Sequence, residues 1–269
     1  DRHSVFQLTL EPELRSALER DTLQLYFQPK IDMAGGRICG AEALLRWNHP
    51  ERGFIPPDAF IPIAEQTGLI EPLTRWVLNK ALEQCSQWHT AGFPISVAVN
   101  LSARSLHNSN IIDHVAQALV NWDVSPRYLY LELTESAIMA DPERAMELLT
   151  RLHNMGVVLS VDDFGTGYSS LAYLKKLPVD EIKIDKSFVM DMNRDSNDSV
   201  IVRSTIDLAH NMSLKVVAEG VEDQDILQHL TSLRCDIVQG YFLSRPLPPA
   251  EFMRRLTELQ WSEVEVGVA

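Results

Sequence analysis

The sequence predicts an α/β fold, a (β/α)8 barrel of the TIM type that is modified by an opening β-hairpin with one antiparallel strand. Short apolar runs alternate with amphipathic helical segments along most of the chain, a pattern typical of parallel strands joined by helices. With the hairpin included, eight strand-like runs can be counted, the number that closes such a barrel. No GxGxxG motif follows the first run, which disfavours an open doubly wound sheet.

Length and composition are compatible with one large domain. The chain has 269 residues, of which 45% are hydrophobic and 23% are charged, as in ordinary globular proteins. No internal repeat, low-complexity segment or proline-rich linker divides it, so we expect a barrel domain over 21–261 and a frayed tail over 262–269. We expect a helix within 1–20, either as part of the core or as a linker from an upstream domain. Because the chain begins at Asp1 without an initiator methionine, we expect a fragment of a longer protein.

The first predicted elements are a helix and a hairpin. Thr9 is expected to cap the helix, which has Pro12 in its first turn and leucines along one face. Residues 23–31 are predicted to form a strand, and the glycines at 35–36 a turn into a second strand over 38–47. Two helices follow, at 56–64 and 71–88.

The remaining elements alternate regularly between strand and helix. The predicted strands are 95–99, 128–133, 157–161, 181–184, 214–218 and 237–238. The predicted helices among them are 111–122, 142–155, 200–212 and 223–233.

Charge and cysteine content exclude several classes of function. A net charge of −13 argues against binding to DNA, RNA or anionic membranes, which requires basic patches. An anionic ligand would therefore need bound cations. The three cysteines form no CxxC pair, which argues against a zinc knuckle or a disulfide framework and favours the cytoplasm. No apolar run approaches ~18 residues, so we expect no membrane segment here, although the chain could be the cytoplasmic domain of a membrane-anchored protein.

Polar residues follow almost every predicted strand. The carboxyl ends of barrel strands open on one face, where barrel enzymes place their active sites. Taken singly, such a residue is more often a helix cap or a solvated loop residue. Here, however, residues of this kind end seven separate predicted strands, a combination that chance rarely produces. The residues are Glu42, Asn100, Glu132, Asp162, Asp163, Lys183, Glu219 and Gln239.

The chemical types of these residues point to a metal centre. Carboxylate and amide oxygens without clustered histidines select Mg²⁺ or Mn²⁺ rather than zinc. The carboxylates exceed what one Mg²⁺ needs, so two ions that share a bridging carboxylate are expected. Two-metal sites of this kind hydrolyse phosphoesters by in-line displacement.

The stretch Glu42-Ala43-Leu44-Leu45-Arg46-Trp47 resembles the signature of the EAL domains, the cyclic di-GMP phosphodiesterases. The resemblance covers roughly 23–248 and departs at no position where that family needs a metal ligand or a base. Further matching stretches lie at 26–29, 99–102, 132–135, 162–167, 183–185, 218–222 and 239–241.

The resemblance implies roles for the residues at the strand ends. Asp162 would bridge the two ions, and Glu219 would be a ligand of the second ion or the general base. Lys183 would hold the attacking water. The implied metal ligands are Glu42, Asn100, Glu132, Asp162, Asp163 and Glu219, and the implied catalytic residues are Glu42, Asp162, Lys183 and Glu219.

It also implies residues for substrate binding and for support of the loop at 163–168. Arg46 would bind a substrate phosphate, and the other expected contacts are Gln28, Leu44 and Gln239. Glu135 would brace the loop, although without the resemblance it would be read as a helix cap. Glu222 would either support Glu219 or cap the helix that begins near Asp223, and Asp185 is expected to be an N-cap.

The implied activity is hydrolysis of cyclic di-GMP to linear pGpG with two Mg²⁺ or Mn²⁺ ions. The resemblance also implies a homodimer and a fused upstream sensor or diguanylate cyclase domain. Residue type alone suggests Tyr241, Phe242 and Pro246 as a stacking surface for guanine. One alternative is a cyclic di-GMP receptor that does not cleave its ligand. A second, more remote one is a metal-assisted lyase or enolising barrel.

Overall fold

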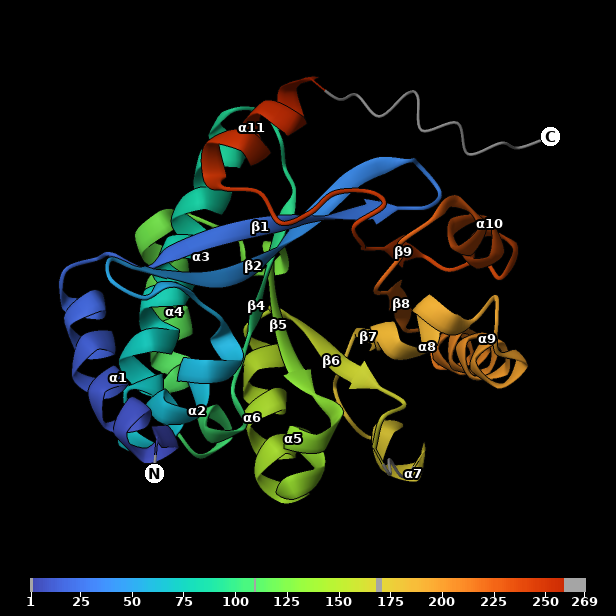
Figure 1. The fold of residues 1–269 in the computed structure, drawn as a ribbon. Helices are drawn as coiled ribbons and strands as arrows, with labels where there is room; N and C mark the ends of the chain where they lie inside the picture. The colour runs from blue at the N-terminus through green and yellow to red at the C-terminus, as the bar shows by residue number, and fades with distance from the viewer. Residues whose placement is uncertain (1, 109, 168–170, 259–269) are drawn as a thin grey trace.

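The computed structural model describes residues 2–108, 110–167 and 171–258. Its central feature is a closed barrel of eight strands, which confirms the predicted fold class (Figure 1). The barrel strands are β1 (Gln24–Asp32), β2 (Arg37–His49), β4 (Ser96–Asn100), β5 (Leu129–Thr134), β6 (Val158–Phe164), β7 (Glu181–Ile184), β8 (Lys215–Ala218) and β9 (Ile237–Val238).

The pairing of β1 closes the barrel and breaks its parallel order. The sheet runs β1-β9-β8-β7-β6-β5-β4-β2, and β1 pairs with β2 to complete the circle. β1 is antiparallel to both neighbours, whereas the other seven barrel strands of the described residues run parallel to one another. The predicted hairpin with one antiparallel strand is therefore confirmed. The short strand β3 (Gly53–Ile55) extends the outer end of β2.

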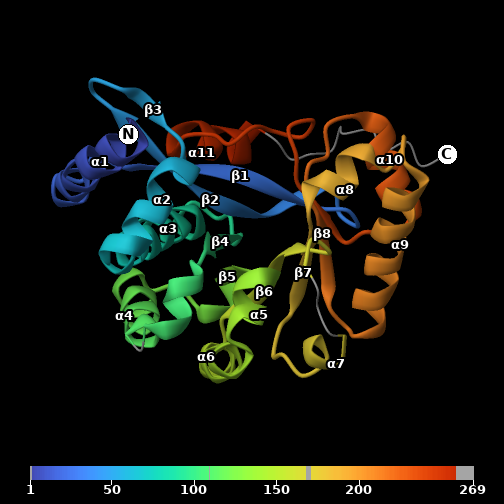
Figure 2. The same ribbon diagram turned by 60° about the horizontal axis from the view of Figure 1, so that its bottom comes forward.

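Helices cover the outside of the barrel, as Figures 1 and 2 show from two directions. None of the described helices is both long and apolar enough to cross a membrane. The longer helices are α1 (Arg2–Glu19), α2 (Pro57–Thr67), α3 (Ile70–Thr90), α4 (Ile111–Trp122), α6 (Pro142–Asn154), α9 (Ser196–Asn211), α10 (Gln224–Ser232) and α11 (Pro249–Glu258). The shorter ones are η1 (Ala103–His107), η2 (Pro126–Tyr128), α5 (Glu135–Ala140), α7 (Leu171–Leu174) and α8 (Lys186–Asp191).

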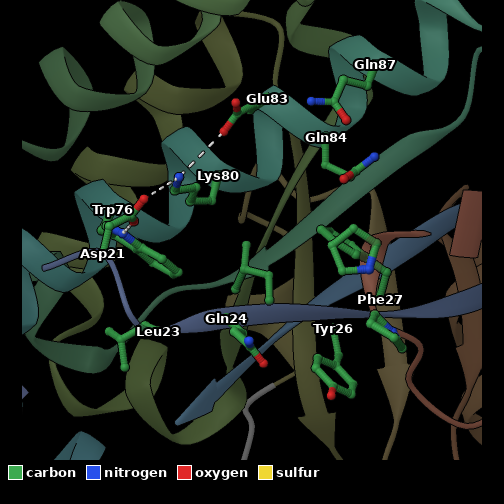
Figure 3. Close-up of a pocket in the computed structure, with 13 residues that line it drawn as sticks. Asp21, Leu23, Gln24, Tyr26, Phe27, Trp76, Lys80, Glu83, Gln84 and Gln87 are labelled. Atoms are coloured by element: carbon green, nitrogen blue, oxygen red, sulfur yellow. Dashed lines mark hydrogen bonds and ion pairs between the residues drawn. The ribbon is translucent and has the colours of Figure 1, made fainter. Parts of the chain in front are cut away.

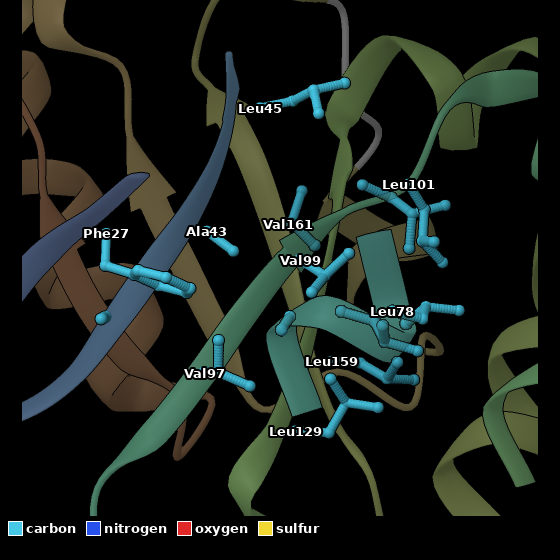
Figure 4. Close-up of a cluster of buried hydrophobic side chains, with 14 of the residues drawn as sticks. Phe27, Ala43, Leu45, Leu78, Val97, Val99, Leu101, Leu129, Leu159 and Val161 are labelled. Atoms are coloured by element: carbon cyan, nitrogen blue, oxygen red, sulfur yellow. The ribbon is translucent and has the colours of Figure 1, made fainter. Parts of the chain in front are cut away.

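Two-residue periodicity in the strands separates the core from the site. Successive side chains of a strand point to opposite faces, so the apolar residues of each strand face the helices while their neighbours face the barrel interior. Figure 4 shows Val97 and Val99 of β4 gathered with Leu159 and Val161 of β6 and with Leu78 of α3. The outward faces therefore build the hydrophobic core, and the polar inward faces remain available for chemistry.

The prediction for the first helix is wrong in its start. α1 begins at Arg2, so Thr9 lies inside the helix and is not its cap, and Pro12 lies inside it as well. Leu10 and Leu14 are fully buried, which shows that packing against the domain stabilises the helix on both sides of Pro12. Tertiary packing here overrides the local start signal. The predicted tail at 262–269 and the domain end at 261 lie outside the described residues.

Most other predicted elements are present with small shifts at their ends. α9 begins at Ser196, before the predicted residue 200, because Asp195 caps it by accepting a hydrogen bond from the Asn197 backbone N–H. β6 extends beyond its predicted end at 161 and includes both aspartates, to Phe164. The helix expected after Asp185 is present as α8. The elements β3, α5 and α11 were not predicted; β3 and α5 are short, and α5 follows immediately after β5.

Candidate active site

Every strand of the described barrel sends a polar side chain to one end of its interior. The predicted strand-end residues therefore come together as expected from barrel geometry. In strand order they are Gln28 (β1), Glu42 (β2), Asn100 (β4), Glu132 (β5), Asp162 (β6), Lys183 (β7), Glu219 (after β8) and Gln239 (after β9).

Lys183 lies at the centre of this cluster and is fully buried. Its ammonium nitrogen is 2.6 Å from Glu132 Oε2 and 2.8 Å from Glu219 Oε1. It is also 3.1 Å from Asp162 Oδ1 and 3.7 Å from Glu42 Oε2. One cation thus faces four carboxylates, which leaves an excess of negative charge in a buried place.

Hydrogen bonds from amide side chains fix the orientation of Glu42. Asn100 Nδ2 donates to Glu42 Oε1 at 2.7 Å, and Gln239 Nε2 donates to Glu42 Oε2 at 2.7 Å. Gln239 Nε2 also donates to Gln28 Oε1, and Gln28 in turn donates to the Ser244 carbonyl. The Oε1 atom of Gln239 is buried without a hydrogen-bond partner, so an acceptor remains available in the site.

The cluster separates the pKa values of two of its carboxyl groups. Burial raises the pKa of Glu219, the charges of Asp162 and Glu42 add to the rise, and it reaches about 8 although Lys183 opposes the shift. Burial alone would also raise the pKa of Glu132, but Lys183 and Lys30 reverse that effect and lower it to about 2. Glu132 therefore stays ionised, whereas Glu219 can exchange a proton near neutral pH.

Asp162 and Asp163 reach the same side of the sheet because β6 is irregular at this point. The pairing of β6 with β7 shifts register between Val161 and Phe164. Asp163 has a positive φ of 53°, and its N–H donates to Asp162 Oδ1 at 3.0 Å. Consecutive residues of a regular strand would point to opposite faces, so the irregularity is what allows both aspartates to join the site.

Asp162, Asp163 and Glu219 form a group that fits a divalent cation. One oxygen from each of the three carboxylates lies within 4.8 Å of the others. The donors are hard oxygen atoms, the described group contains no imidazole or thiolate, and burial raises the pKa of Asp162 and of Asp163. A bound Mg²⁺ or Mn²⁺ would match this donor chemistry and balance the excess charge.

Glu135 contacts the loop that follows the aspartates, as predicted. It is buried, and its Oε2 accepts a hydrogen bond from the Gly165 N–H at 2.9 Å. A Cβ atom on Gly167 would lie 3.0 Å from Glu135 Oε1, so the loop packs closely on this carboxylate. The alternative reading as a cap is wrong, because Thr134 caps α5. Tyr168, at the end of the predicted loop, lies outside the described residues.

Two further predicted supporting residues have different outcomes. Asp185 caps α8 by accepting a hydrogen bond from the Ser187 N–H, which confirms the prediction for this residue. Asp223 caps α10, so the reading of Glu222 as the cap is wrong. Glu222 is exposed and lines the same pocket as Glu219, and its supporting role stays a prediction.

Two of the four predicted substrate-binding residues, Gln28 and Gln239, line a pocket beside the acidic cluster. A pocket of about 330 Å³ lies between the end of β9 and α8, with Gln28, Glu42, Glu219, Gln239 and Tyr241 among its lining residues. On β2, Leu44 and Arg46 share the inward face with Glu42. The Arg46 guanidinium lies 5.7 Å from the Tyr26 ring centroid and 5.9 Å from that of Phe54.

A larger pocket elsewhere does not belong to this site. It has a volume of about 500 Å³ and lies between β1 and α3, on the outside of the barrel (Figure 3). Asp21, Trp76 and Lys80 lie at one end of it, and Asp21 accepts hydrogen bonds from both of the others. None of the clustered carboxylates lines this pocket, so pocket volume alone does not identify the candidate active site.

The sequence interpretation missed a second layer of buried polar residues beneath the first. Lys30 lies between two glutamates, 2.9 Å from Glu132 Oε1 and 3.2 Å from Glu181 Oε1. Ser160 donates to Glu181 Oε1 at 3.0 Å, and the Lys30 ammonium lies 5.4 Å from the Tyr130 ring centroid. Each of these four lies two residues from a predicted site residue on the same strand, and this spacing is the signal that could have found them.

Comparisons with known proteins identify the family of this chain. The EAL domain family matches residues 11–246. The bifunctional diguanylate cyclase/cyclic di-GMP phosphodiesterase MucR of Pseudomonas aeruginosa is 45% identical over 248 residues, which are 92% of this chain and 36% of that protein. The cyclic di-GMP phosphodiesterase NbdA of the same organism is 45% identical over 252 residues, 92% of this chain and 32% of that protein. The chain thus spans about a third of the length of these curated relatives.

Solved structures give the same result. The PaMucR phosphodiesterase in complex with c-di-GMP superposes with a TM-score of 0.87 at 44% identity, covering 91% of this chain and 99% of that one. The EAL domain of FimX from Pseudomonas aeruginosa, bound to c-di-GMP, has a TM-score of 0.80 at 28% identity and covers 87% of this chain and 94% of that one. With the barrel, the acidic cluster and the family match over most of its length, this chain belongs to the EAL domain family.

Proposed function

We propose that this chain is the catalytic domain of a divalent-metal-dependent phosphodiesterase that hydrolyses cyclic di-GMP to linear pGpG. The observation that carries the proposal is the convergence of Glu42, Glu132, Asp162 and Glu219 around one buried lysine, with Asp163 beside them. The names of the two curated relatives and the c-di-GMP bound to the PaMucR structure support the choice of substrate.

The donor set divides naturally between two cation positions. Glu42, Asn100, Glu132 and Asp162 would hold one ion, and Asp162, Asp163 and Glu219 the other. When bound, Mg²⁺ or Mn²⁺ supplies Lewis acidity that lowers the pKa of water and neutralises phosphodiester charge. This supply of positive charge also explains how a protein of net charge −13 accepts an anionic dinucleotide.

The residues of the chain have separate tasks in the reaction. Lys183 donates hydrogen bonds from the floor of the site and orients the attacking water. Glu219, whose carboxylate lies 2.8 Å from the Lys183 ammonium, is placed to accept a proton from that water. The water oxygen bonds to phosphorus, the bond from phosphorus to the 3′ oxygen breaks, and that oxygen takes up a proton. Arg46 binds a phosphate oxygen and so places the phosphorus over the cluster.

Turnover of cyclic di-GMP, followed by chromatography of the product, tests the proposal directly. We expect pGpG in the presence of Mg²⁺ or Mn²⁺ and none in EDTA. Glu42→Ala should abolish turnover, whereas Glu51→Ala, which alters an exposed glutamate in a loop, should not. Turnover that survives EDTA or the Glu42→Ala change would contradict the two-metal account. Tight binding of cyclic di-GMP without product would instead favour a receptor.

We also propose a homodimer within a longer protein that acts in the cytoplasm. The chain spans about a third of its curated relatives, one of which is named as a bifunctional diguanylate cyclase/phosphodiesterase. The loop held by Glu135 would link occupancy of the cation site to the partner or to a fused domain. Sedimentation of the chain with and without substrate tests the association, and a monomer under both conditions would contradict it.

A further inference from the structure

The Glu132 carboxylate is held from both sides by buried lysines. Lys183 contacts its Oε2 at 2.6 Å from within the cluster, and Lys30 contacts its Oε1 at 2.9 Å from below. Glu132 is 1% exposed and Lys30 is 3% exposed, so water cannot substitute for either contact. Each oxygen of the Glu132 carboxylate therefore contacts a different lysine, and the two lysines together fix the orientation of the carboxylate.

Lys30 is itself fixed in place by the barrel interior. Glu181 Oε1 accepts its second contact at 3.2 Å, and Ser160 donates to that same oxygen. A buried ammonium is costly unless it is paired, so a lysine with two carboxylate partners is a built feature of the fold.

We propose that Lys30 is a positioning residue that presents Glu132 to the divalent cation site. The χ3 torsion angle, which rotates the carboxylate of a glutamate, has a broad range of allowed values. Without Lys30 the Glu132 carboxylate can therefore rotate so that both oxygens face Lys183. With Lys30 in place, Oε1 is occupied and Oε2 faces the cluster. This inference rests on the proposed function, since it concerns the affinity of the same site for its metal. Partners that orient metal ligands typically change metal affinity by about 10- to 100-fold.

The test is Mn²⁺ binding in the absence of substrate, measured from the electron paramagnetic resonance signal of the free ion. Lys30→Met alone would leave Glu181 buried and unpaired, so the variant to use is K30M/E181Q, with E181Q as its matched control. E181Q keeps the contact between Lys30 and Glu132, and its side chain can still accept from Ser160. We expect wild-type Mn²⁺ affinity in E181Q and an affinity about 10- to 100-fold weaker in K30M/E181Q.

Two additional measurements separate positioning from general damage. Circular dichroism spectra in EDTA should agree between K30M/E181Q and E181Q, and at saturating Mn²⁺ the two variants should have similar kcat values. Should K30M/E181Q not fold, K30Q/E181Q tests the same prediction with a polar group at the buried position. Equal Mn²⁺ affinity in the control and the variant would overturn this inference alone. Absence of Mn²⁺ binding by the wild-type protein would overturn the proposed function as well.

Discussion

The Lys183 ammonium lies 2.8 Å from the Glu219 carboxylate, yet the pKa of Glu219 is raised to about 8. A single ion pair would normally lower the pKa of a carboxyl group. Here burial has the larger effect, and Lys183 is shared with Glu132, Asp162 and Glu42. The site therefore holds more carboxyl groups than Lys183 can keep ionised, and the pKa values of Glu42 and Asp162 are raised as well.

This relationship predicts how the stability of the metal-free protein depends on pH. The pKa of Glu219 rises from an ordinary value of 4.5 to about 8 in the folded state, so between these limits the folded state binds a proton that the unfolded state has released. The stabilisation is complete below pH 4.5 and is lost as the pH rises through about 8, with a slope of at most about 1.4 kcal/mol per pH unit. Urea unfolding in EDTA across this range measures it, and Glu219→Gln should flatten the profile. An unchanged profile in Glu219→Gln would contradict the shift.

Removal of Lys183 should affect both stability and activity. Lys183→Met leaves four carboxylates around an apolar side chain, so we expect a loss of about 3–5 kcal/mol in the free energy of unfolding in EDTA. Divalent cations should recover part of this loss because they replace the missing charge. Turnover should fall at least about 100-fold even with saturating metal. Denaturant curves with EDTA and with Mg²⁺, beside kinetic assays, check both parts. Lys175→Met, which alters an exposed lysine, is the control.

Glu135 should matter through one hydrogen bond to the loop. Glu135→Ala removes the acceptor for the Gly165 N–H, and we expect the metal concentration for half-maximal activity to rise about tenfold. Glu135→Gln keeps a side-chain oxygen that can accept the same bond, so its activation curve should stay close to that of the wild type. Metal titrations of cyclic di-GMP turnover distinguish these variants. If Glu135→Ala retains normal metal activation and turnover, the loop is only a turn.

Arg46 should contribute to substrate affinity more than to the chemical step. Arg46→Met should raise KM for cyclic di-GMP about 10- to 100-fold, the magnitude expected for one charge-assisted hydrogen bond. Arg46→Lys keeps the charge but loses the planar fork, so a smaller rise is expected. Steady-state kinetics with saturating metal measure the change, with Arg37→Met at the exposed start of β2 as control. A KM unchanged in Arg46→Met would remove this residue from the phosphate contact.

The sequence allowed prediction of the upper layer of the site because most of its residues lie at or near the end of a predicted strand, although Glu42 lies in the middle of β2 in the structure. Glu42, Glu132 and Lys183 could be grouped without coordinates, since parallel strands open on one face. Lys30 and Glu181 were missed, because a lone lysine or glutamate within a strand is more often on a solvated face. Their two-residue spacing from Gln28 and Lys183 places them on the same face of each strand, and the closed barrel shows that this face is buried.

Other features depended on local geometry that residue type does not specify. The register shift between Val161 and Phe164 lets Asp163 join Asp162, and no residue in that stretch signals it without the fold. The placement of Phe54 against Arg46 depends on β3, a strand of three residues and too short to predict from periodicity. The start of α1 was missed for a different reason, because buried leucines continue the helix through Pro12.

The closure of the barrel by its first strand has a consequence for how the protein is made. β1 pairs with β9, and Phe27 exchanges two backbone hydrogen bonds with Leu247. Gln28 and Gln239, which bond in the site, are 211 positions apart in the chain. During synthesis the first strand must therefore wait for almost the entire domain to leave the ribosome before it finds its last partner. A nascent or prematurely terminated chain that lacks β9 has neither a closed barrel nor a complete site, so assembly of the catalytic centre and completion of the fold occur in a single late event.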